Sequence, residues 1–458
     1  MTDTEALMWS VEQNPQLRST MGAIAIVEGT PDLDRLRATI IKALPTVPAL
    51  RERVQPSGIP LVPPERVLDQ HLDIDHHLRA LRLPAPASMA TLEALACRII
   101  NDPFDRDRPL WQITVVAGLP RRRSAVIVKL HHSIADGQGA LGLAAHLLEF
   151  KANAPAPEMG SVQEILDSLA ADSPLDPNPA SLGDSLRFGA ERIAGFFNEA
   201  ANALANPQRA AEAGAAAKHL ADQLPSSDDT ARSALWTQRS GNRRLVTYAA
   251  PLKLLQSAAR EREIRLNELF VAACAEAAVR QHDRAGVELP ELQTSVVIST
   301  RSTDDDPASN AFVPIAVGLP GTGAGHDERL GELRRQIQTK RDDVATTAGA
   351  MGAFGTVANL LPASVAASIA LQQTRRIDIA TSNLPGPAIP LWIAGTKIAS
   401  LRPVGPVGGT AFNTTLLTLG DEAAFGLHID PATGIDPATL RDDLRSGLQG
   451  LGVKGLPS

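Results

Sequence analysis

The pattern of apolar and polar residues along the chain predicts a mixture of strands and helices at both ends. Short apolar runs predict strands at residues 23–27, 125–128, 295–299, 311–317 and 424–430. Apolar residues at helical spacing predict helices at 32–44, 89–100, 329–344, 362–374 and 437–448, and one or two helices within 251–282. Ser88 is placed to cap the second of these helices. The two ends therefore mix sheet and helix in a similar order.

The middle of the chain has a different composition. Five prolines interrupt its first part, and Ala-rich sequence with a helical pattern follows over residues 184–223. An apolar stripe in that segment is expected to pack on the protein itself, with contact to a lipid surface as the second option. A chain of 458 residues exceeds the usual size of one hydrophobic core. We expect an N-terminal half at 1–150, a Pro/Ala-rich helical connecting arm at 151–235 and a C-terminal half at 236–458.

Composition and charge narrow the class of protein. The chain is 44% hydrophobic and 21% charged, as ordinary soluble globular proteins are. Its formal net charge is −7, and the one basic run is Arg121-Arg122-Arg123, so it lacks the footprint of a nucleic-acid binder. That run is expected to decorate a hairpin turn. Cys97 and Cys274 lie in helical apolar segments and are expected to be buried thiols, neither disulfide-bonded nor metal-binding.

The first residues are acidic and lack the apolar core of a signal peptide. No uninterrupted apolar run approaches the roughly 18 residues that a membrane span needs. We therefore expect a cytoplasmic protein, with peripheral contact to a membrane or a lipid inclusion as a further option.

Residues 131–137 read His-His-Ser-Ile-Ala-Asp-Gly, between an expected strand and an expected helix. A loop held by rigid elements presents a side chain with little positional error, and imidazole suits proton transfer near neutral pH. Asp136 can fix the loop through an ion pair, and Gly137 allows backbone conformations that a Cβ forbids. The pair His76-His77 has no such Asp-Gly after it, so we expect a structural role there.

This HHxxxDG motif and the preceding Pro109-Leu110-Trp111 resemble the bacterial wax ester synthase/diacylglycerol acyltransferase family. That family belongs to the coenzyme A-dependent acyltransferase superfamily, with condensation domains and chloramphenicol acetyltransferase. The resemblance covers nearly the whole chain. Further matching segments are residues 101–108, Asn267-Glu268, Ser299-Thr300-Arg301, Asn310, Leu319-Pro320 and Ser382-Asn383-Leu384-Pro385-Gly386-Pro387.

The resemblance implies an α/β fold of two pseudo-duplicated chloramphenicol-acetyltransferase-like domains with the active-site tunnel between them. It implies an O-acyltransferase that moves a long-chain acyl group from acyl-coenzyme A to diacylglycerol or to a long-chain alcohol. His132 is then the general base, and His131 supports it. No covalent enzyme intermediate is needed, and no cofactor is expected beyond acyl-coenzyme A as co-substrate.

The roles of the other matched residues stay open at this stage. Arg301 is the favoured partner of Asp136, although a solvated arginine at a strand end fits its position as well. An oxyanion donor is needed, and Asn267, Asn413 and Thr414 are the candidates; Asn267 fits a plain helix N-cap equally well. Pro109, Leu110 and Trp111 are expected to support the core near the tunnel. The Asn383 turn is expected to shape the channel between the halves.

Three departures from the family pattern leave the identity of the acyl acceptor undetermined. Glu268 replaces an Asp, Ser309 replaces a Gly, and Thr418-Leu419 stands where Ser-Tyr is common. Diacylglycerol, a long-chain alcohol and another hydroxyl acceptor all fit, as does a catalytically weak paralogue that binds acyl lipids or lipid-body partners. A carrier-dependent condensation enzyme is disfavoured by Pro109-Leu110-Trp111. A serine hydrolase or a zinc enzyme is disfavoured because the chain lacks a Gly-x-Ser-x-Gly elbow and a His-Glu-x-x-His motif.

Overall fold

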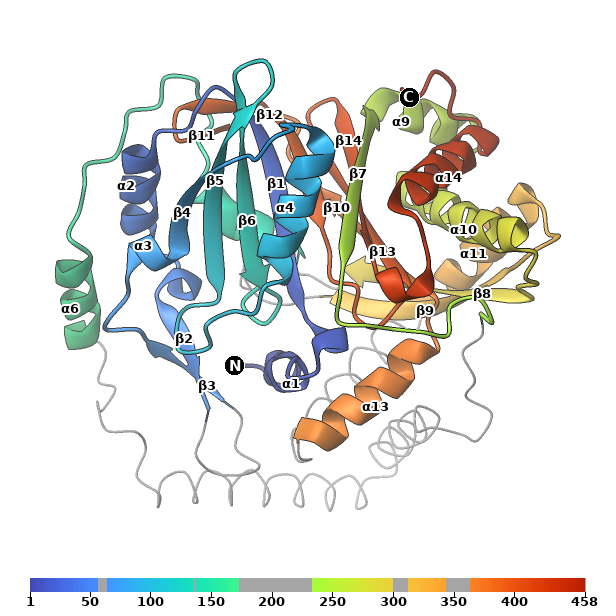
Figure 1. The fold of residues 1–458 in the computed structure, drawn as a ribbon, viewed down its shortest axis with the longest axis horizontal. Coiled ribbons are helices and arrows are strands. Elements are labelled where there is room, and N and C mark those ends of the chain that lie inside the picture. The colour runs from blue at the N-terminus through green and yellow to red at the C-terminus, as the bar shows by residue number, and fades with distance from the viewer. Residues whose placement is uncertain (57–63, 136, 173–232, 300–311, 343–362, 458) are drawn as a thin grey trace.

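Two six-stranded sheets with helices packed against them form the body of the protein (Figure 1). The computed structural model describes residues 1–56, 64–135, 137–172, 233–299, 312–342 and 363–457. In the first sheet the order is β11 (Trp392–Ile393), β12 (Thr396–Val404), β1 (Thr20–Glu28), β6 (Arg123–His131), β5 (Trp111–Leu119) and β4 (Leu78–Arg82). The strand pairs are antiparallel except for β4 with β5.

Helices and a small hairpin surround this first sheet. They are α2 (Leu33–Ala43), α3 (Ile74–His77), α4 (Met89–Asn101), α5 (Gly137–Ala145), α6 (Val162–Asp172), η2 (Pro48–Leu50) and the pair β2 (Glu52–Gln55) and β3 (Glu65–Leu68). Local chemistry fixes two of the helix starts. The side chains of Asp32 and Ser88 accept hydrogen bonds from the first turns of α2 and α4.

The second sheet has a core of parallel strands. Its order is β7 (Arg244–Pro251), β14 (Glu422–Ile429), β13 (Phe412–Leu419), β10 (Ile379–Pro385), β8 (Glu291–Ser299) and β9 (Phe312–Pro320). β10 runs parallel to both β13 and β8. The accompanying helices are α9 (Leu252–Glu261), α10 (Leu266–Ala285), α11 (His326–Asp342), η3 (Pro431–Thr433) and α14 (Pro437–Gly450). Residues 269–279 of α10 are all buried, so this helix forms the centre of the second core.

Strands from the C-terminal part of the chain complete the N-terminal sheet. β12 pairs antiparallel with β1, and β11 extends the same edge, although residues 392–404 follow the second sheet's β10 in sequence. The two sheets are therefore interlocked by the chain itself. At the lower edge in Figure 1, α1 (Asp3–Val11) and η1 (Pro15–Leu17) pack on α13 (Ala363–Arg375).

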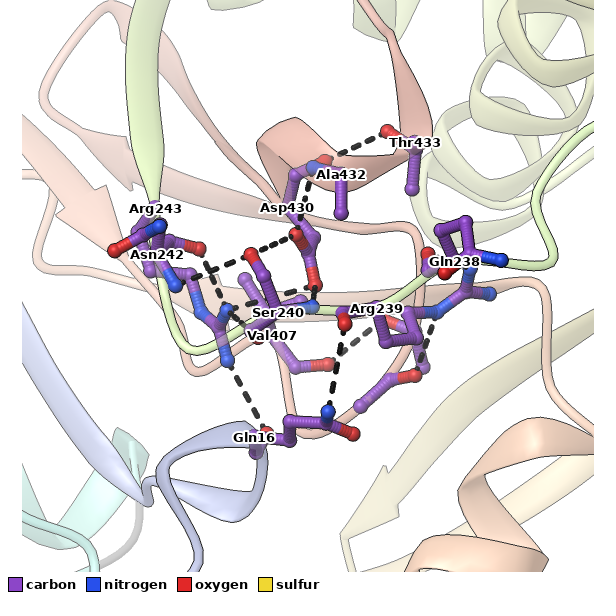
Figure 2. A network of polar contacts seen from close by, with 12 residues as sticks. Gln16, Gln238, Arg239, Ser240, Asn242, Arg243, Val407, Asp430, Ala432 and Thr433 are labelled. Atoms are coloured by element: carbon purple, nitrogen blue, oxygen red, sulfur yellow. Dashed lines mark hydrogen bonds and ion pairs between the residues drawn. The ribbon is translucent and has the colours of Figure 1, made fainter.

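A buried polar network, shown in Figure 2 and called here the inter-half clasp, also joins the halves. Asp430 is 1% exposed, and its carboxylate accepts from the backbone N–H and the hydroxyl of Ser240, both at 2.6 Å. The Arg243 guanidinium lies 3.7 Å from the same carboxylate and donates to the Gln16 carbonyl at 3.1 Å. The clasp thus ties η1 of the N-terminal half to the segment before β7.

The elements expected at both ends of the chain are confirmed, and 251–282 proves to be two helices, α9 and α10. Arg121 and Arg122 form the β5–β6 turn, with φ of 60° and 55°. Cys97 and Cys274 are free and buried. The expected helix at 184–223 lies outside the described residues. The boundaries at 150 and 235 stay predictions, and strands β11 and β12 show that the sheets do not follow such a linear division.

Candidate active site

His131 is the last residue of β6 and is held at both ring nitrogens. Its side chain is 1% exposed, and Nδ1 accepts from the Ser133 backbone N–H at 3.0 Å. Since Nδ1 is the acceptor, the ring proton is on Nε2, which donates to the carboxylate of Glu12. The ring also makes edge-to-face contacts with the rings of Trp9 and Phe104. His131 is therefore fixed within the protein.

His132 points the other way, because successive side chains of a strand alternate between its faces. Its backbone N–H donates to the Ser19 carbonyl at 2.9 Å, which continues the β6–β1 edge past the strand end. The side chain lines a cavity of about 220 Å³, together with Val128 and Leu130 of β6. The cavity lies between the two halves. β1, β6 and α5 line it on one side, together with β12 of the same sheet, and β10 and β13 of the second sheet line the other side.

The lining of this cavity is almost wholly apolar. Among the described residues that line it, His132 carries the only titratable side chain, and Ser382 and Thr415 are the other two with polar ends, apart from the Trp111 indole. The Trp111 indole N–H is already used, since it donates to the Leu50 carbonyl at 3.0 Å. The Thr415 hydroxyl donates to Asn413 Oδ1 at 2.8 Å. The cavity is thus built for an alkyl chain, with one imidazole and two hydroxyls.

The Pro-Leu-Trp segment anchors the histidine strand. Leu110 is fully buried, and its carbonyl accepts from the His131 backbone N–H at 3.0 Å. Trp111 is 2% exposed and lines the cavity directly, so it is more than core support. Pro109 is buried beside them.

The turn after β10 also forms part of the cavity wall. Ser382, Leu384, Gly386 and Pro387 line the cavity, whereas Asn383 lies on the opposite face of the strand. Strand alternation separates two of the candidate oxyanion donors in the same way. Asn413 shares the face of Thr415, and Thr414 lies on the other face, beside Cys274 of α10.

Asn267 is the second residue of α10, and the helix N-cap is Arg265, so the N-cap interpretation of Asn267 is wrong. Glu268 does the capping instead: its carboxylate accepts from the Arg265 backbone N–H at 2.9 Å. A carboxylate at the third helical position reaches back in this way. In the part of the chain that the structure describes, neither Asn267 nor Glu268 lines the cavity.

Gly137 is the first residue of α5, which continues the loop into the cavity wall. Asp136, Arg301, Ser309 and Asn310 lie outside the described residues, so the Asp136–Arg301 ion pair stays a prediction.

The other histidine pair has a packing role. His77 Nδ1 lies 2.8 Å from the Trp111 carbonyl, and its ring stacks on the Trp111 ring at 4.3 Å. Burial lowers the pKa of His77 to about 4, which keeps it neutral. Lys129, on the face of β6 away from the cavity, donates to the Asp102 carbonyl at the end of α4 at 2.7 Å. Burial lowers the pKa of Lys129 to about 8.

Sequence reasoning missed Glu12, and it did not single out Ser382 or Thr415 within the segments that it named. The latter two follow the strand alternation of segments already singled out, whereas no local pattern marked Glu12. Within the described residues, no three His, Cys, Asp or Glu side chains cluster as a metal site would require. Nor does any helix in those ranges have the length and apolar character of a membrane span.

Comparisons with known proteins agree with this architecture. A Mycobacterium tuberculosis protein (strain H37Rv) with the name of a diacylglycerol O-acyltransferase is 26% identical over 444 residues, which are 96% of this chain and 89% of the relative. A probable diacylglycerol O-acyltransferase of strain CDC 1551 is 28% identical over 424 residues, covering 90% of this chain and 86% of the relative.

Solved structures share the fold. The wax ester synthase/diacylglycerol acyltransferase of Marinobacter aquaeolei VT8 superposes with a TM-score of 0.66 at 21% identity, covering 98% of this chain and 97% of that one. A starter condensation domain of rhizomide synthetase, in complex with C8-CoA and Leu-SNAC, gives 0.58 at 15% identity, covering 99% and 93%. The fold is thus the two-domain α/β fold of these enzymes, related to chloramphenicol acetyltransferase.

Two family profiles match this sequence. The wax ester synthase/diacylglycerol acyltransferase catalytic domain matches residues 1–270, and the C-terminal domain of the same enzymes matches residues 308–452. The protein with the HHxxxDG loop at this inter-half cavity therefore belongs to the wax ester synthase/diacylglycerol acyltransferase family.

Proposed function

We propose that this protein transfers a long-chain acyl group from acyl-coenzyme A to the hydroxyl of diacylglycerol or of a long-chain alcohol. The observation that carries the proposal is that His132 is the one titratable side chain, among the described residues, that lines the apolar cavity between the halves. The His132 imidazole, which can accept a proton, is thus exposed to a cavity whose apolar lining suits an alkyl chain. The names of the relatives and the C8-CoA bound to a structural neighbour support the donor and the acceptor class.

The chemistry needs one base and one hydrogen-bond donor. The His132 imidazole takes the hydroxyl proton as the alcohol oxygen attacks the thioester carbonyl, since a neutral alcohol is a weak nucleophile. The tetrahedral oxyanion then collapses, the bond to sulfur breaks, and the imidazolium returns its proton to the departing coenzyme A thiolate. No acyl-enzyme forms, and no cofactor is required beyond the co-substrate.

The Ser382 hydroxyl is the candidate donor to the oxyanion, because it is a polar group that shares the cavity with His132. Thr415 shares the cavity as well, but its one hydroxyl proton is donated to Asn413 Oδ1 and is not available to an oxyanion in this arrangement. Asn267 and Thr414 are not proposed as oxyanion donors, because in the described structure neither side chain lines the cavity.

The apolar wall favours long acyl chains, because each buried methylene contributes about 0.8 kcal/mol. Phe150, another lining residue, is 53% exposed, and Ile389 beyond Pro387 is 48% exposed. These side chains support peripheral contact with a membrane or lipid inclusion, from which water-insoluble acceptors enter.

The acceptor is tested with purified protein, labelled palmitoyl-coenzyme A, and either dipalmitoylglycerol or hexadecanol in mixed micelles. Labelled triacylglycerol or wax ester, resolved by thin-layer chromatography, is the expected product, and the ratio of specificity constants names the preferred acceptor. Stoichiometric fatty acid with no ester product would overturn acyl transfer in favour of hydrolysis. No turnover with either acceptor, with acyl-coenzyme A still bound in equilibrium dialysis, would favour a lipid-binding paralogue.

A further inference from the structure

The N-terminal helix contacts the HHxxxDG loop along one face. Glu5, Trp9 and Glu12 are four and then three residues apart, which is the spacing that places side chains on one side of a helix. Glu12 follows directly after α1 in helical conformation, so it continues this face. All three side chains reach toward the loop that carries His132.

Glu12 makes the most direct of these contacts. Its carboxylate accepts the Nε2 proton of His131, and this leaves Nδ1 of the same ring to accept from the Ser133 backbone N–H. The next backbone bond, from the Ile134 N–H to the His131 carbonyl at 3.1 Å, closes the turn. His132 lies inside that turn. The carboxylate of Glu12 therefore favours the His131 tautomer in which Nδ1 accepts from Ser133 within this turn.

Two further contacts hold the same turn from α1. The Glu5 carboxylate lies 3.2 Å from the Arg66 guanidinium, and Arg66 donates to the Ser133 carbonyl at 2.7 Å. The Trp9 and His131 rings make an edge-to-face contact with their centroids 6.0 Å apart, and the Arg106 guanidinium lies over the Trp9 ring, 3.4 Å from its centroid. The helix and the loop thus share an ionic, a hydrogen-bonded and an aromatic contact.

We infer that Glu12 is a positioning residue, which acts through the His131 tautomer to hold His132 toward the cavity, and that α1 is the element that orients the HHxxxDG turn. Without the carboxylate, Nε2–H of His131 is left without its acceptor in a buried site. The other tautomer would place an Nδ1 proton against the Ser133 N–H, with only the Ser133 hydroxyl, 2.6 Å away, to accept it. The turn then loosens, although the substrate cavity keeps its wall. The expected effect of Glu12 on the reaction rate rests on the proposed function, whereas its expected effect on the turn does not.

The test compares Glu12→Ala, Glu12→Gln and the wild type, with Glu164→Ala on exposed α6 as the matched loss of a carboxylate. Hydrogen exchange of the peptide covering residues 129–135 reports the turn without any turnover. We expect exchange about 10-fold faster in Glu12→Ala in this peptide and unchanged exchange in β5. Glu12→Gln keeps an acceptor oxygen and is expected to restore most of the protection.

In steady-state assays we expect Glu12→Ala to lower kcat by about 10- to 100-fold, as loss of an orienting partner does, with KM for acyl-coenzyme A nearly unchanged. Glu12→Gln should recover most of kcat. Wild-type exchange in Glu12→Ala, or a loss that appears in KM alone, would overturn the positioning role. If Glu12→Ala does not fold, a Glu12→Gln protein as slow as a His132 variant would also overturn it. A wild type that shows no acyl transfer refutes the proposed function, and the exchange data still decide the role of Glu12.

Discussion

At the scale of single residues, the two adjacent histidines divide the work because a strand alternates its faces. His131 is buried, with Nε2 on Glu12 and Nδ1 on Ser133, whereas His132 lines the cavity. Under the proposed function, we expect a substitution of His131 to act on the turn and a substitution of His132 to act on the proton transfer itself.

Two other histidines link stability to pH. Burial lowers the pKa of His77 and of His428 to about 4, from 6.5 in the unfolded chain. Between these values the unfolded chain binds a proton that the folded chain refuses, so the free energy of unfolding falls as the pH decreases from about 6.5 to 4. From pH 7 to pH 5 each histidine is expected to remove about 2 kcal/mol.

His428→Gln tests this linkage. His428 accepts from the Asn101 side chain at 3.0 Å and donates to the Gly405 carbonyl at 2.8 Å, and glutamine cannot titrate. Urea unfolding at pH 7 and pH 5 should show the variant losing about 2 kcal/mol less than the wild type over this interval. An identical loss in both proteins would mean that His428 is not the titrating group.

At the scale of elements, β1 lies so close to its neighbours that it tolerates no side chain at Gly22. A Cβ there would lie 2.6 Å from the Val128 carbonyl and 2.8 Å from the Ile100 side chain of α4. Gly22→Ala is expected to lower the free energy of unfolding by about 1–3 kcal/mol. Gly331 is exposed on α11, and an added Cβ would find nothing within 4 Å, so it should respond oppositely: Gly331→Ala is expected to raise the free energy of unfolding by about 0.5–1 kcal/mol.

Chemical denaturation of these two variants measures both values. Equal changes of the same sign would show that the packing of β1 under α4 is looser than described.

The elements themselves were predictable because helices and strands have local signals, such as the Asp32 and Ser88 caps and the alternation through β6. Their partners were not. Nothing in residues 392–404 indicates that β12 pairs with β1 across more than 350 residues, because pairing register depends on contacts distant in sequence. The same limit applies to the site: His131 and His132 belong to a recognisable sequence motif, but Glu12 contacts His131 only through the tertiary fold.

At the scale of the whole molecule, the halves are held by the shared sheet and by the inter-half clasp of Figure 2. Asp430→Asn places an amide group where the Ser240 backbone N–H now donates at 2.6 Å, and it leaves buried Arg243 without its counter-charge. Breaking one partner of a buried pair costs about 3–5 kcal/mol. We expect urea unfolding to show a decrease of this order in the free energy of unfolding. A decrease no larger than that of a surface substitution would show that the inter-half clasp contributes little to holding the halves together.

The cavity exists only because these two halves meet, with His132 from one half facing Ser382 and Thr415 from the other. The central claim is that this histidine removes the acceptor proton. The most direct test is the rate of coenzyme A release from palmitoyl-coenzyme A, with diacylglycerol or hexadecanol present, by wild type, His132→Ala and the Glu164→Ala control. We predict that His132→Ala is slower by about 10²–10⁴-fold at unchanged thermal stability, while the control matches the wild type. A folded His132→Ala protein that releases coenzyme A at the wild-type rate would contradict the account.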